Sequence, residues 1–565
     1  MLDSASLLKL LALLGLAAAV AILGRRMLLP RRYPGIPYNT ASAGRISGDL
    51  PDLMPVYRAT NEVTRAIADI TTRKLGTPIA QLLFPSVRRP LIVVDDPREV
   101  EDIVVRRNKQ FDRAPTFVGM FKPMFPTATI SQFTTPALRA QKRLWADVMS
   151  TEFLRRVAAP NIHRSASELV ELWRLKASTV HRDRPFDVHE DFKDATLDVI
   201  WTTVVGDNPG ATRYSIQRLQ SQLAGKEAAD LTPPDGHCIK EQVAYINDAI
   251  ARADSSVIPP LALKLQTYTA RYRKFRRTVN GEMRRAMQKA AGRFHSLEVG
   301  RLEDEAIDRC AMDLVLRRQI LQAKKAGVTP SDPTRDQTML DEMFVLLVAG
   351  HDSTANTLCW FLRIMELYPA VQDELRAVLR AAFPGPAPPS AAEIVQADVP
   401  YLDAACEETF RLSCTATCSL RQALVDTHVL GCPVPKGAEL LLIYCVDRAP
   451  PPVDEALRSD TSRASAEKLG DGLQGAPGRD LGTFQPRRWL VRDEQTGKEV
   501  FNAYAVPSLT FGGGYRGCFG RKLAVMELRI MVVLLILSFE FLPLPEDLRG
   551  MSAHEKVFRE PDFPA

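Results

Sequence analysis

The chain has 565 residues, of which 46% are hydrophobic and 25% are charged, a composition typical of globular proteins. Lysine and arginine (73) nearly balance aspartate and glutamate (67), and a net charge of +6 is too small to indicate a nucleic-acid-binding protein. The 9 cysteines are scattered, without a CxxC pair or a Cys/His cluster at zinc-finger spacing. This excludes a disulfide scaffold and favours a reducing compartment.

An apolar segment begins the chain. Residues 4–24 carry a single charge and are close to the roughly 20 residues that cross a bilayer. The alternative is a cleaved signal peptide with its cleavage site near Ala17–Ala19, but the positive charge follows the apolar run, from Arg25 onward. We therefore expect a transmembrane anchor at 4–24 and a basic, proline-rich neck at 25–38. The positive-inside rule then places residues 39–565 on the cytosolic side of a membrane.

Helical patterns dominate the rest of the chain, above all from Arg139 to about Gly327. Short apolar segments at Leu91–Asp95 and Glu439–Cys445 are typical of strands. The stretch Pro450–Asp480 is rich in Pro, Gly, Ser and Asp and indicates a long surface loop. No linker separates two patterns, so we expect one mainly α domain with a small β region.

The strongest motif is FGGGYRGCFG at residues 511–520, followed by a helical run from Arg521. A glycine-rich turn lets the backbone approach a flat ligand closely. Cys518 stands at a helix N-terminus, where free N–H groups favour a thiolate, and a thiolate is a haem iron ligand. Arg516 could pair with an anionic propionate. A phosphate-binding loop is disfavoured because no GK[ST] or GxGxxG follows a strand here.

These residues resemble the FxxGxRxCxG haem-binding loop of the cytochrome P450 superfamily, whose fixed positions are Phe511, Gly514, Arg516, Cys518 and Gly520. Other segments resemble that family's signatures and occur in its order: AGHDST at 349–354, ETFR at 408–411 and FQPRRW at 484–489. With the anchor and neck, the likeness covers nearly the whole chain and is that of a membrane-bound fungal member. It implies the cytochrome P450 fold in a single catalytic domain at 39–565, with haem b on the Cys518 thiolate.

The resemblance also implies a buried structural triad of Glu408, Arg411 and Arg488 behind the haem loop. Glu408 and Arg411 are three residues apart and share a helix face. The same spacing recurs elsewhere in the chain, so the spacing alone does not indicate the triad. The position of this pair among the family's other motifs does.

Propionate ligands are less clearly marked. The early-helix Trp of the family's W-x-x-x-R is missing, and either Lys142 or Arg143 takes the place of the Arg. Arg421 falls where the family often has another propionate ligand. These three residues are therefore candidate cofactor contacts, and the choice between Lys142 and Arg143 stays open.

Asp352, Ser353 and Thr354 are the candidate catalytic residues, because the family's central helix uses an acid followed by a hydroxyl in oxygen activation. Thr354 lies about 100° further round the helix than Ser353, so we expect Ser353 to face the reaction. Gly350 would leave room for O2. In the alternative interpretation, Ser353 only bonds a carbonyl one turn back.

The function that the resemblance implies is a haem-dependent monooxygenase that inserts one oxygen atom from O2 into a lipophilic small molecule, in secondary metabolism. Electrons would come from NADPH–cytochrome P450 reductase, with cytochrome b5 as a further candidate donor, at the endoplasmic reticulum membrane. A basic face comprising Lys142, Arg143, Arg521 and Lys522 would suit an acidic partner. The alternatives are a haem-thiolate lyase or isomerase, which needs neither O2 nor reductase, and a haem sensor without turnover.

The substrate itself is not encoded in a recognisable motif. Candidate pocket segments are the apolar stretch Phe117–Phe125 and the region between Gly225 and Pro260. Their apolar character favours a lipophilic ligand.

Overall fold

The computed structural model describes residues 13–14, 16, 24–182, 184–225, 237–254, 256, 258–469 and 480–562. The expected anchor at 4–24 lies outside the described residues, apart from four of its positions. Within the described part of the chain, no helix is both long and apolar enough to cross a membrane. The anchor therefore stays a prediction.

Helices form most of the protein, which confirms the mainly α prediction. The longer ones are α9 (Ala159–Ser178), α10 (His189–Val204), α11 (Ala211–Leu223), α12 (His237–Asp254), α14 (Ala270–His295), α16 (Ala311–Lys325), α17 (Gln337–Leu367), α18 (Pro369–Ala382), α20 (Pro400–Ser413) and α22 (Arg521–Ser538). The shorter ones are α2 (Thr40–Ala43), α3 (Leu50–Thr60), α4 (Val63–Ala68), α5 (Pro97–Val105), α6 (Pro115–Phe121), α7 (Pro136–Trp145), α8 (Thr151–Phe153), α13 (Pro259–Gln266), α15 (Val299–Leu302), α19 (Ala391–Gln396) and α21 (Asp460–Leu469).

The small β region is also present. Its main sheet has the order β1-β2-β7-β4-β3, made of β1 (Ile79–Leu82), β2 (Leu91–Val94), β7 (Glu439–Ile443), β4 (Cys418–Ala423) and β3 (Phe111–Arg113). Three two-stranded sheets pair β5 (Thr427–Val429) with β6 (Cys432–Val434), β8 (Leu490–Arg492) with β9 (Glu499–Phe501), and β10 (Ala553–Glu555) with β11 (Arg559–Pro561). The two strands expected from sequence are β2 and β7, which are parallel neighbours.

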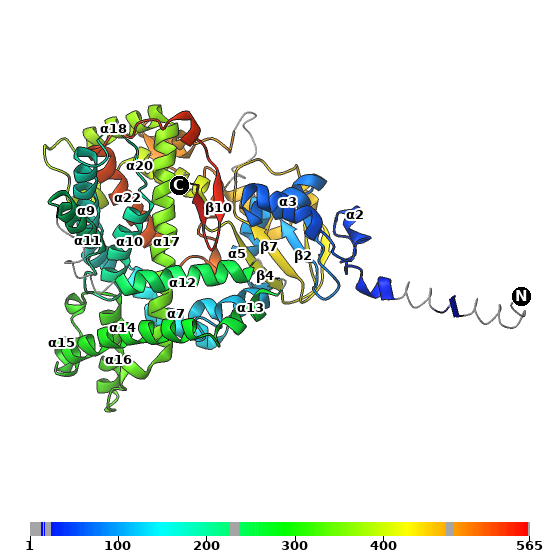
Figure 1. Ribbon diagram of the computed structural model, residues 1–565, viewed down its shortest axis with the longest axis horizontal. Coiled ribbons are helices and arrows are strands. Elements are labelled where there is room, and N and C mark those ends of the chain that lie inside the picture. The colour runs from blue at the N-terminus through cyan, green and yellow to red at the C-terminus, as the bar shows by residue number, and fades with distance from the viewer. Residues whose placement is uncertain are drawn as a thin grey trace, which may run out of the picture.

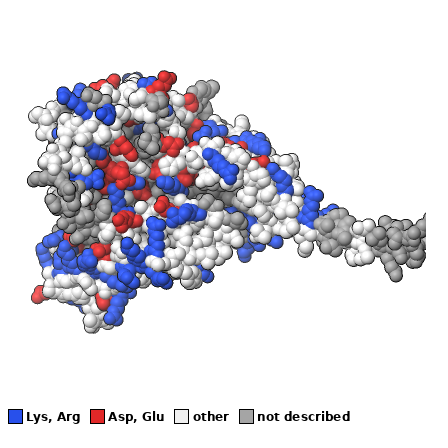
Figure 2. Space-filling model, viewed as in Figure 1, with Lys and Arg blue, Asp and Glu red and all other residues white. Residues whose placement is uncertain are grey.

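The helical region and the main sheet lie side by side (Figure 1), with α17 running through the helical region. Lys and Arg side chains are unevenly distributed, and in the same view they gather over α14 and α16 (Figure 2).

The expectation of a loop at Pro450–Asp480 is wrong for part of the segment, because residues 460–469 form α21. Ion pairs hold this segment to α5. Arg98 binds the Glu455 carboxylate, and Arg458 binds Asp96 through two N–H···O bonds of 2.9 Å. The composition of the segment gave no indication of these long-range partners.

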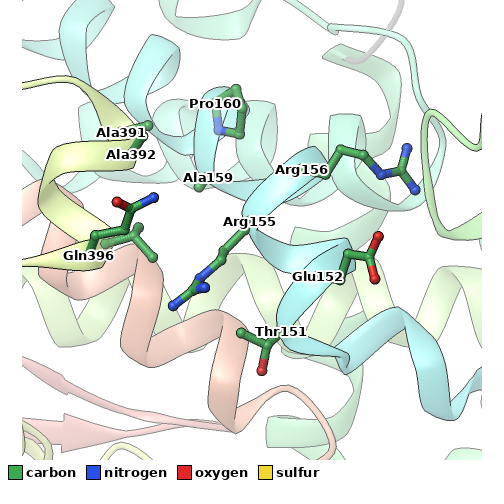
Figure 3. Close-up of a pocket in the computed structure, with 10 residues that line it drawn as sticks. Thr151, Glu152, Arg155, Arg156, Ala159, Pro160, Ala391, Ala392 and Gln396 are labelled. Atoms are coloured by element: carbon green, nitrogen blue, oxygen red, sulfur yellow. The ribbon is translucent and has the colours of Figure 1, made fainter. Parts of the chain in front are cut away.

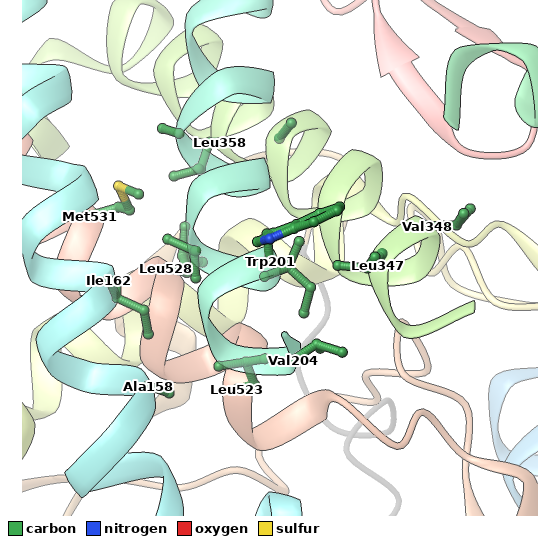
Figure 4. Packing of buried hydrophobic residues seen from close by; sticks show 14 of the residues in the cluster. Ala158, Ile162, Trp201, Val204, Leu347, Val348, Leu358, Leu523, Leu528 and Met531 are labelled. Carbon is green, nitrogen blue, oxygen red and sulfur yellow. The ribbon is translucent and has the colours of Figure 1, made fainter. Parts of the chain in front are cut away.

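The core surrounds α17. The helix α17 begins at Gln337, directly after its N-cap Asp336, whose carboxylate accepts the N–H groups of Thr338 and Met339. It ends at Leu367, and the next residue, Tyr368, precedes a proline. Side chains of α10, α17 and α22, with Ile162 of α9, interdigitate in one apolar cluster (Figure 4). Each fully buried aliphatic side chain there contributes about 2 kcal/mol.

Gly350 serves this packing. A Cβ at Gly350 would lie 2.6 Å from Cδ1 of Ile200 on α10, so the glycine lets α10 and α17 approach closely. The expectation that its missing side chain makes room for O2 is therefore wrong, because that side of the helix faces α10.

Candidate haem-thiolate site

The loop that carries Cys518 is shaped by two glycines. Gly512 and Gly514 both have φ of +60°, a region that L side chains rarely adopt. A Cβ on Gly514 would also lie 2.3 Å from the Val104 carbonyl oxygen, so α5 packs directly on the loop. The Cys518 N–H donates to the Phe511 carbonyl at 2.8 Å and closes the loop just before α22.

Cys518 itself is exposed, although protein surrounds it closely enough that burial raises the pKa of its thiol. The Gly520 N–H and Arg521 lower this pKa, but the effect of burial is larger. Coordination to a metal cation deprotonates a thiol outright. An accessible but enclosed sulfur at the end of a glycine-rich loop is suited to hold an iron.

A cluster of cations lies beside the loop. Arg113 on β3 is paired in register with Arg421 on β4, and Arg516 and Lys142 complete the cluster. Burial, together with the positive charges of Arg516 and Arg421, lowers the pKa of Arg113 to about 9. Burial and the positive charges of Arg516 and Arg113 lower the pKa of Lys142, and burial lowers that of Arg516.

Acidic side chains offset only part of this charge. An Asp112 carboxylate oxygen lies 3.3 Å from Nη2 of Arg516, and Glu342 raises the pKa of Arg113 and of Lys142 from a greater distance. Clustered cations that depress one another's pKa are relieved by an anionic ligand. The four residues therefore fit a group with two carboxylates, as haem has, and the cysteine fits its iron.

In the structure, the side chains of Lys142 and Arg143 have different environments. Lys142 Nζ donates to the Tyr515 carbonyl at 2.6 Å and lies over the Tyr515 ring, whereas Arg143 is exposed. Arg113 was missed by the sequence analysis. It lies in no recognised motif, and its relation to Arg421 exists only through the pairing of two strands far apart in the chain.

The oxygen-side candidates lie together on α17. Asp352 Oδ1 is 3.0 Å from His351 Nδ1, and the Asn247 side-chain amide of α12 donates to Oδ2. Burial opposes the charge of Asp352, but His351 and Lys193 more than offset it, so the pKa of Asp352 lies below its ordinary value.

The Ser353 hydroxyl donates to the Ala349 carbonyl at 2.6 Å, which is the bond expected in the alternative interpretation. This bond uses the hydroxyl proton and leaves the oxygen lone pairs able to accept. The Ser353 side chain is only half-buried, whereas Thr354 is buried. Of the two hydroxyls, that of Ser353 is thus the accessible one.

The structural triad is assembled as its motifs indicate. Glu408 is fully buried and accepts two bonds of 2.8 Å from Arg411, one of 2.9 Å from Arg488 and one of 2.8 Å from Trp489. These contacts fix α20 to the 3-10 helix η9 (Pro486–Trp489). The ring of Phe410 next to Arg411 meets that of Phe511 at 4.9 Å, which connects the triad to the cysteine loop.

A surface pocket of about 550 Å³ lies between residues 151–160 and α19 (Figure 3). It contains none of the predicted site residues. The candidate active site is therefore defined by Cys518, the cation cluster and α17, and not by this pocket.

Comparison with known proteins agrees with this geometry. The family model described as Cytochrome P450 matches residues 78–446 and 482–562. The chain is 32% identical to the cytochrome P450 monooxygenase GME11363 of Pestalotiopsis microspora over 96% of each chain. It is 29% identical to the cytochrome P450 monooxygenase TRI13 of Fusarium sporotrichioides over 94% of each chain.

A crystal structure of a cytochrome P450, CYP102L1, has the same fold, with a TM-score of 0.61 and 16% identity over 90% of this chain and 94% of that one. The site and fold are those of a haem-thiolate protein, and the chain belongs to the cytochrome P450 family. It is a monooxygenase whose cofactor is haem b, with a cysteine thiolate as iron ligand.

Proposed function

We propose that this monooxygenase inserts one oxygen atom from O2 into a lipophilic small molecule of fungal secondary metabolism, with electrons from a separate NADPH-dependent flavoprotein reductase. The observation that carries the proposal is the placement of two neighbouring groups on α17: the Asp352 carboxylate, held by His351 and Asn247, and the accessible Ser353 hydroxyl. A lyase or isomerase that rearranges its substrate without O2 has no need of an acid and a hydroxyl placed to transfer protons.

The proposed site residues have two roles, binding the haem and transferring protons. Cys518 would ligate the iron, and Arg113, Lys142, Arg421 and Arg516 would hold the two carboxylates. The haem supplies the oxygen-activating chemistry when bound. The ionised Asp352 accepts a proton at its carboxylate and passes it toward the oxygen site. Ser353 Oγ, oriented by its bond to Ala349, accepts a hydrogen bond there.

The electron donor would dock on the face that carries Arg143, Arg521 and Lys522, which are exposed. These charges suit an acidic reductase, or cytochrome b5 as a second donor. Lys142, expected on the same face, instead donates into the cysteine loop.

The anchor at 4–24 and the neck at 25–38 would attach the enzyme to the endoplasmic reticulum, with residues 39–565 in the cytosol. The sequence supports this arrangement through the arginines that follow the apolar run. Protease treatment of intact microsomes should degrade the domain, whereas protection of the domain would contradict the orientation.

Reconstitution tests the reaction. Purified holoenzyme in liposomes is incubated with lipid extract of a strain lacking the gene. Product should form only when NADPH, reductase and O2 are all present. Formation without O2 or reductase would instead indicate the lyase or isomerase alternative.

A further inference from the structure

We propose that the pocket between residues 151–160 and α19 is a second binding site, which holds a small amphipathic carboxylate and uses Arg155 as its cation. The volume of about 550 Å³ lies within the roughly 300–1,000 Å³ of pockets that hold small molecules. Since the pocket contains none of the residues assigned to the haem or to oxygen, a ligand here would be an additional one and not the substrate.

Much of the lining is apolar. Ala159 and Pro160 of α9 contribute to it, and so do Ala391, Ala392 and Val395 of α19. These side chains offer neither a charge nor a hydrogen-bonding group, and most of them are small, which leaves room between the two helices. This part of the pocket therefore favours the hydrocarbon part of a ligand, because apolar surface is then removed from water.

Arg155 adds a positive charge to this apolar surface. Its guanidinium extends toward Gln396 at the end of α19, and Thr151 lies on the same side (Figure 3). Arg155 is exposed, and it forms no hydrogen bond or ion pair with any other residue that the structure describes. A guanidinium in this state can donate two parallel hydrogen bonds to a carboxylate. The side chains of Gln396 and Thr151 are further donors.

The other charged groups of the lining are turned elsewhere. Arg156 donates to three carbonyl groups of residues 305–308, at 2.7 to 3.2 Å. Glu152 also lines the pocket, but its carboxylate lies on the side of Arg156 and away from the Arg155 guanidinium (Figure 3). Arg155 is therefore the charge that faces a ligand beside α19, and the ligand that complements it is an anion.

The backbone that carries Arg155 has an unusual conformation. It forms η4 (Leu154–Ala158), a π-helical turn between α8 and α9. A π turn is wider than an α turn and frequently occurs at functional sites. Leu154 and Val157 of this turn are buried in the main apolar cluster, so the turn is fixed while Arg155 stays exposed.

The opposite wall, α19, is also held in place without a ligand. Arg529 of α22 donates to the Ile394 carbonyl at 3.0 Å and to the Ala397 carbonyl at 2.5 Å. His163 Nε2 of α9 lies 2.9 Å from the Pro389 carbonyl oxygen, just before α19. Both walls are thus fixed by contacts outside the pocket, and a preformed pocket is what small-molecule sites usually have.

The test uses the full haem-loaded chain and photolabelling, which requires no turnover. The probes are octanoic acid with a diazirine next to its terminal methyl group, and the primary alcohol with the same chain and diazirine. After irradiation and digestion, mass spectrometry measures the label in peptides covering residues 151–160 and 391–396 over a range of probe concentrations. Label in other peptides is counted separately, so a probe bound near the haem does not affect the result.

The variants change the charge or the space. Arg155→Gln removes the charge, and Arg155→Lys keeps it. Ala392→Trp fills the pocket from α19. Arg164→Gln, at an exposed arginine of α9 that does not line the pocket, is the matched control. The Soret band verifies that each variant has kept its haem and its fold.

The carboxylate probe should label both peptides of the native protein saturably. The concentration for half-saturation should rise about fivefold in Arg155→Gln, because an accessible ion pair is lost, and it should change less in Arg155→Lys and not at all in Arg164→Gln. Ala392→Trp should remove the label. The alcohol should label the native protein more weakly and should not respond to Arg155→Gln.

Three results would overturn the proposal. The first is the absence of saturable label in both peptides of the native protein. The second is equal labelling by the acid and the alcohol with no effect of Arg155→Gln, which would indicate an apolar crevice without an anion site. The third is full labelling of Ala392→Trp, which would place the probe outside the pocket.

Discussion

Arg113 lies directly opposite Arg421 across the pairing of β3 and β4. Two buried guanidinium groups at one register position repel each other, and Arg516 adds to the effect by lowering the pKa of Arg113. The arrangement is stabilised when an anion joins it. We therefore propose that the haem carboxylates bind here.

Arg113→Met should accelerate haem loss by about tenfold, because a charge-assisted hydrogen bond to a carboxylate is removed. Haem transfer to apomyoglobin, followed at the Soret band, measures the rate. Arg143→Met is the matched control and should leave it unchanged, since Arg143 is exposed. Equal rates for Arg113→Met and the native protein would remove Arg113 from the site.

The glycines of the cysteine loop should differ in how well they tolerate substitution by alanine. Gly514→Ala should prevent haem incorporation, because its Cβ would meet the Val104 carbonyl at 2.3 Å and its φ is +60°. The backbone strain alone costs about 1–3 kcal/mol. Gly520→Ala should fold normally, since the nearest atom to its Cβ is Cys518 Sγ at 4.0 Å. The haem-to-protein absorbance ratio of the purified variants gives the answer, and a Gly514→Ala protein with full haem would contradict the packing described.

Sequence reasoning succeeded where the contacts are local. Glu408 and Arg411 pair as their spacing on one helix face predicts. The role of Cys518, read from an equally short motif, stays a prediction. Sequence reasoning could not find Arg113, because a strand pairing over some 300 residues leaves no trace in either local pattern. Lys142 and Arg143 were likewise inseparable, since neighbours on a helix differ by about 100° and only the position of Tyr515 decides between them.

The role of Gly350 was also predicted wrongly, and the reason is physical. Gly350 stands in the oxygen-site motif, but its missing side chain faces Ile200 of α10. A glycine indicates a close approach without saying from which side. The helix α21 was missed because the residues just before it, Glu455 and Arg458, form ion pairs at α5 with residues more than 350 positions away.

Ser353→Ala should retain haem and consume NADPH but divert reducing equivalents to peroxide, because its hydroxyl is the accessible one. Asp352→Asn should slow turnover by impairing proton transfer from solvent. The ratio of product to NADPH, with peroxide measured in parallel, separates these effects. Thr354→Ala is the control; if it uncouples while Ser353→Ala does not, the assignment is reversed.

The β10–β11 hairpin should be more stable at pH 6 than at pH 8. Hydrogen bonding to Glu560, aided by Asp562, raises the pKa of His554 above its ordinary 6.5, against the effects of burial and of Lys556. Its contribution is therefore complete below about pH 6.5 and is lost as the pH rises through the folded-state pKa. The pKa of Glu560 is lowered to about 2, so this carboxylate stays ionised between pH 6 and pH 8. His189 also faces Glu560, and burial lowers the pKa of His189.

Hydrogen exchange of the hairpin, corrected for intrinsic rates, measures this dependence. His554→Gln should abolish the difference between the two pH values. The same pH dependence in the variant and the native protein would show that another group titrates.

The central claim is that Cys518 ligates the iron, and the spectrum of the reduced carbon monoxide complex tests it most directly. Native protein should show the red-shifted Soret band of a thiolate ligand. Cys418→Ala, at another of the 9 cysteines, should keep that band, and Cys518→Ala should lose it together with all oxygenase activity. A Cys518→Ala protein that retained the red-shifted band would contradict the account.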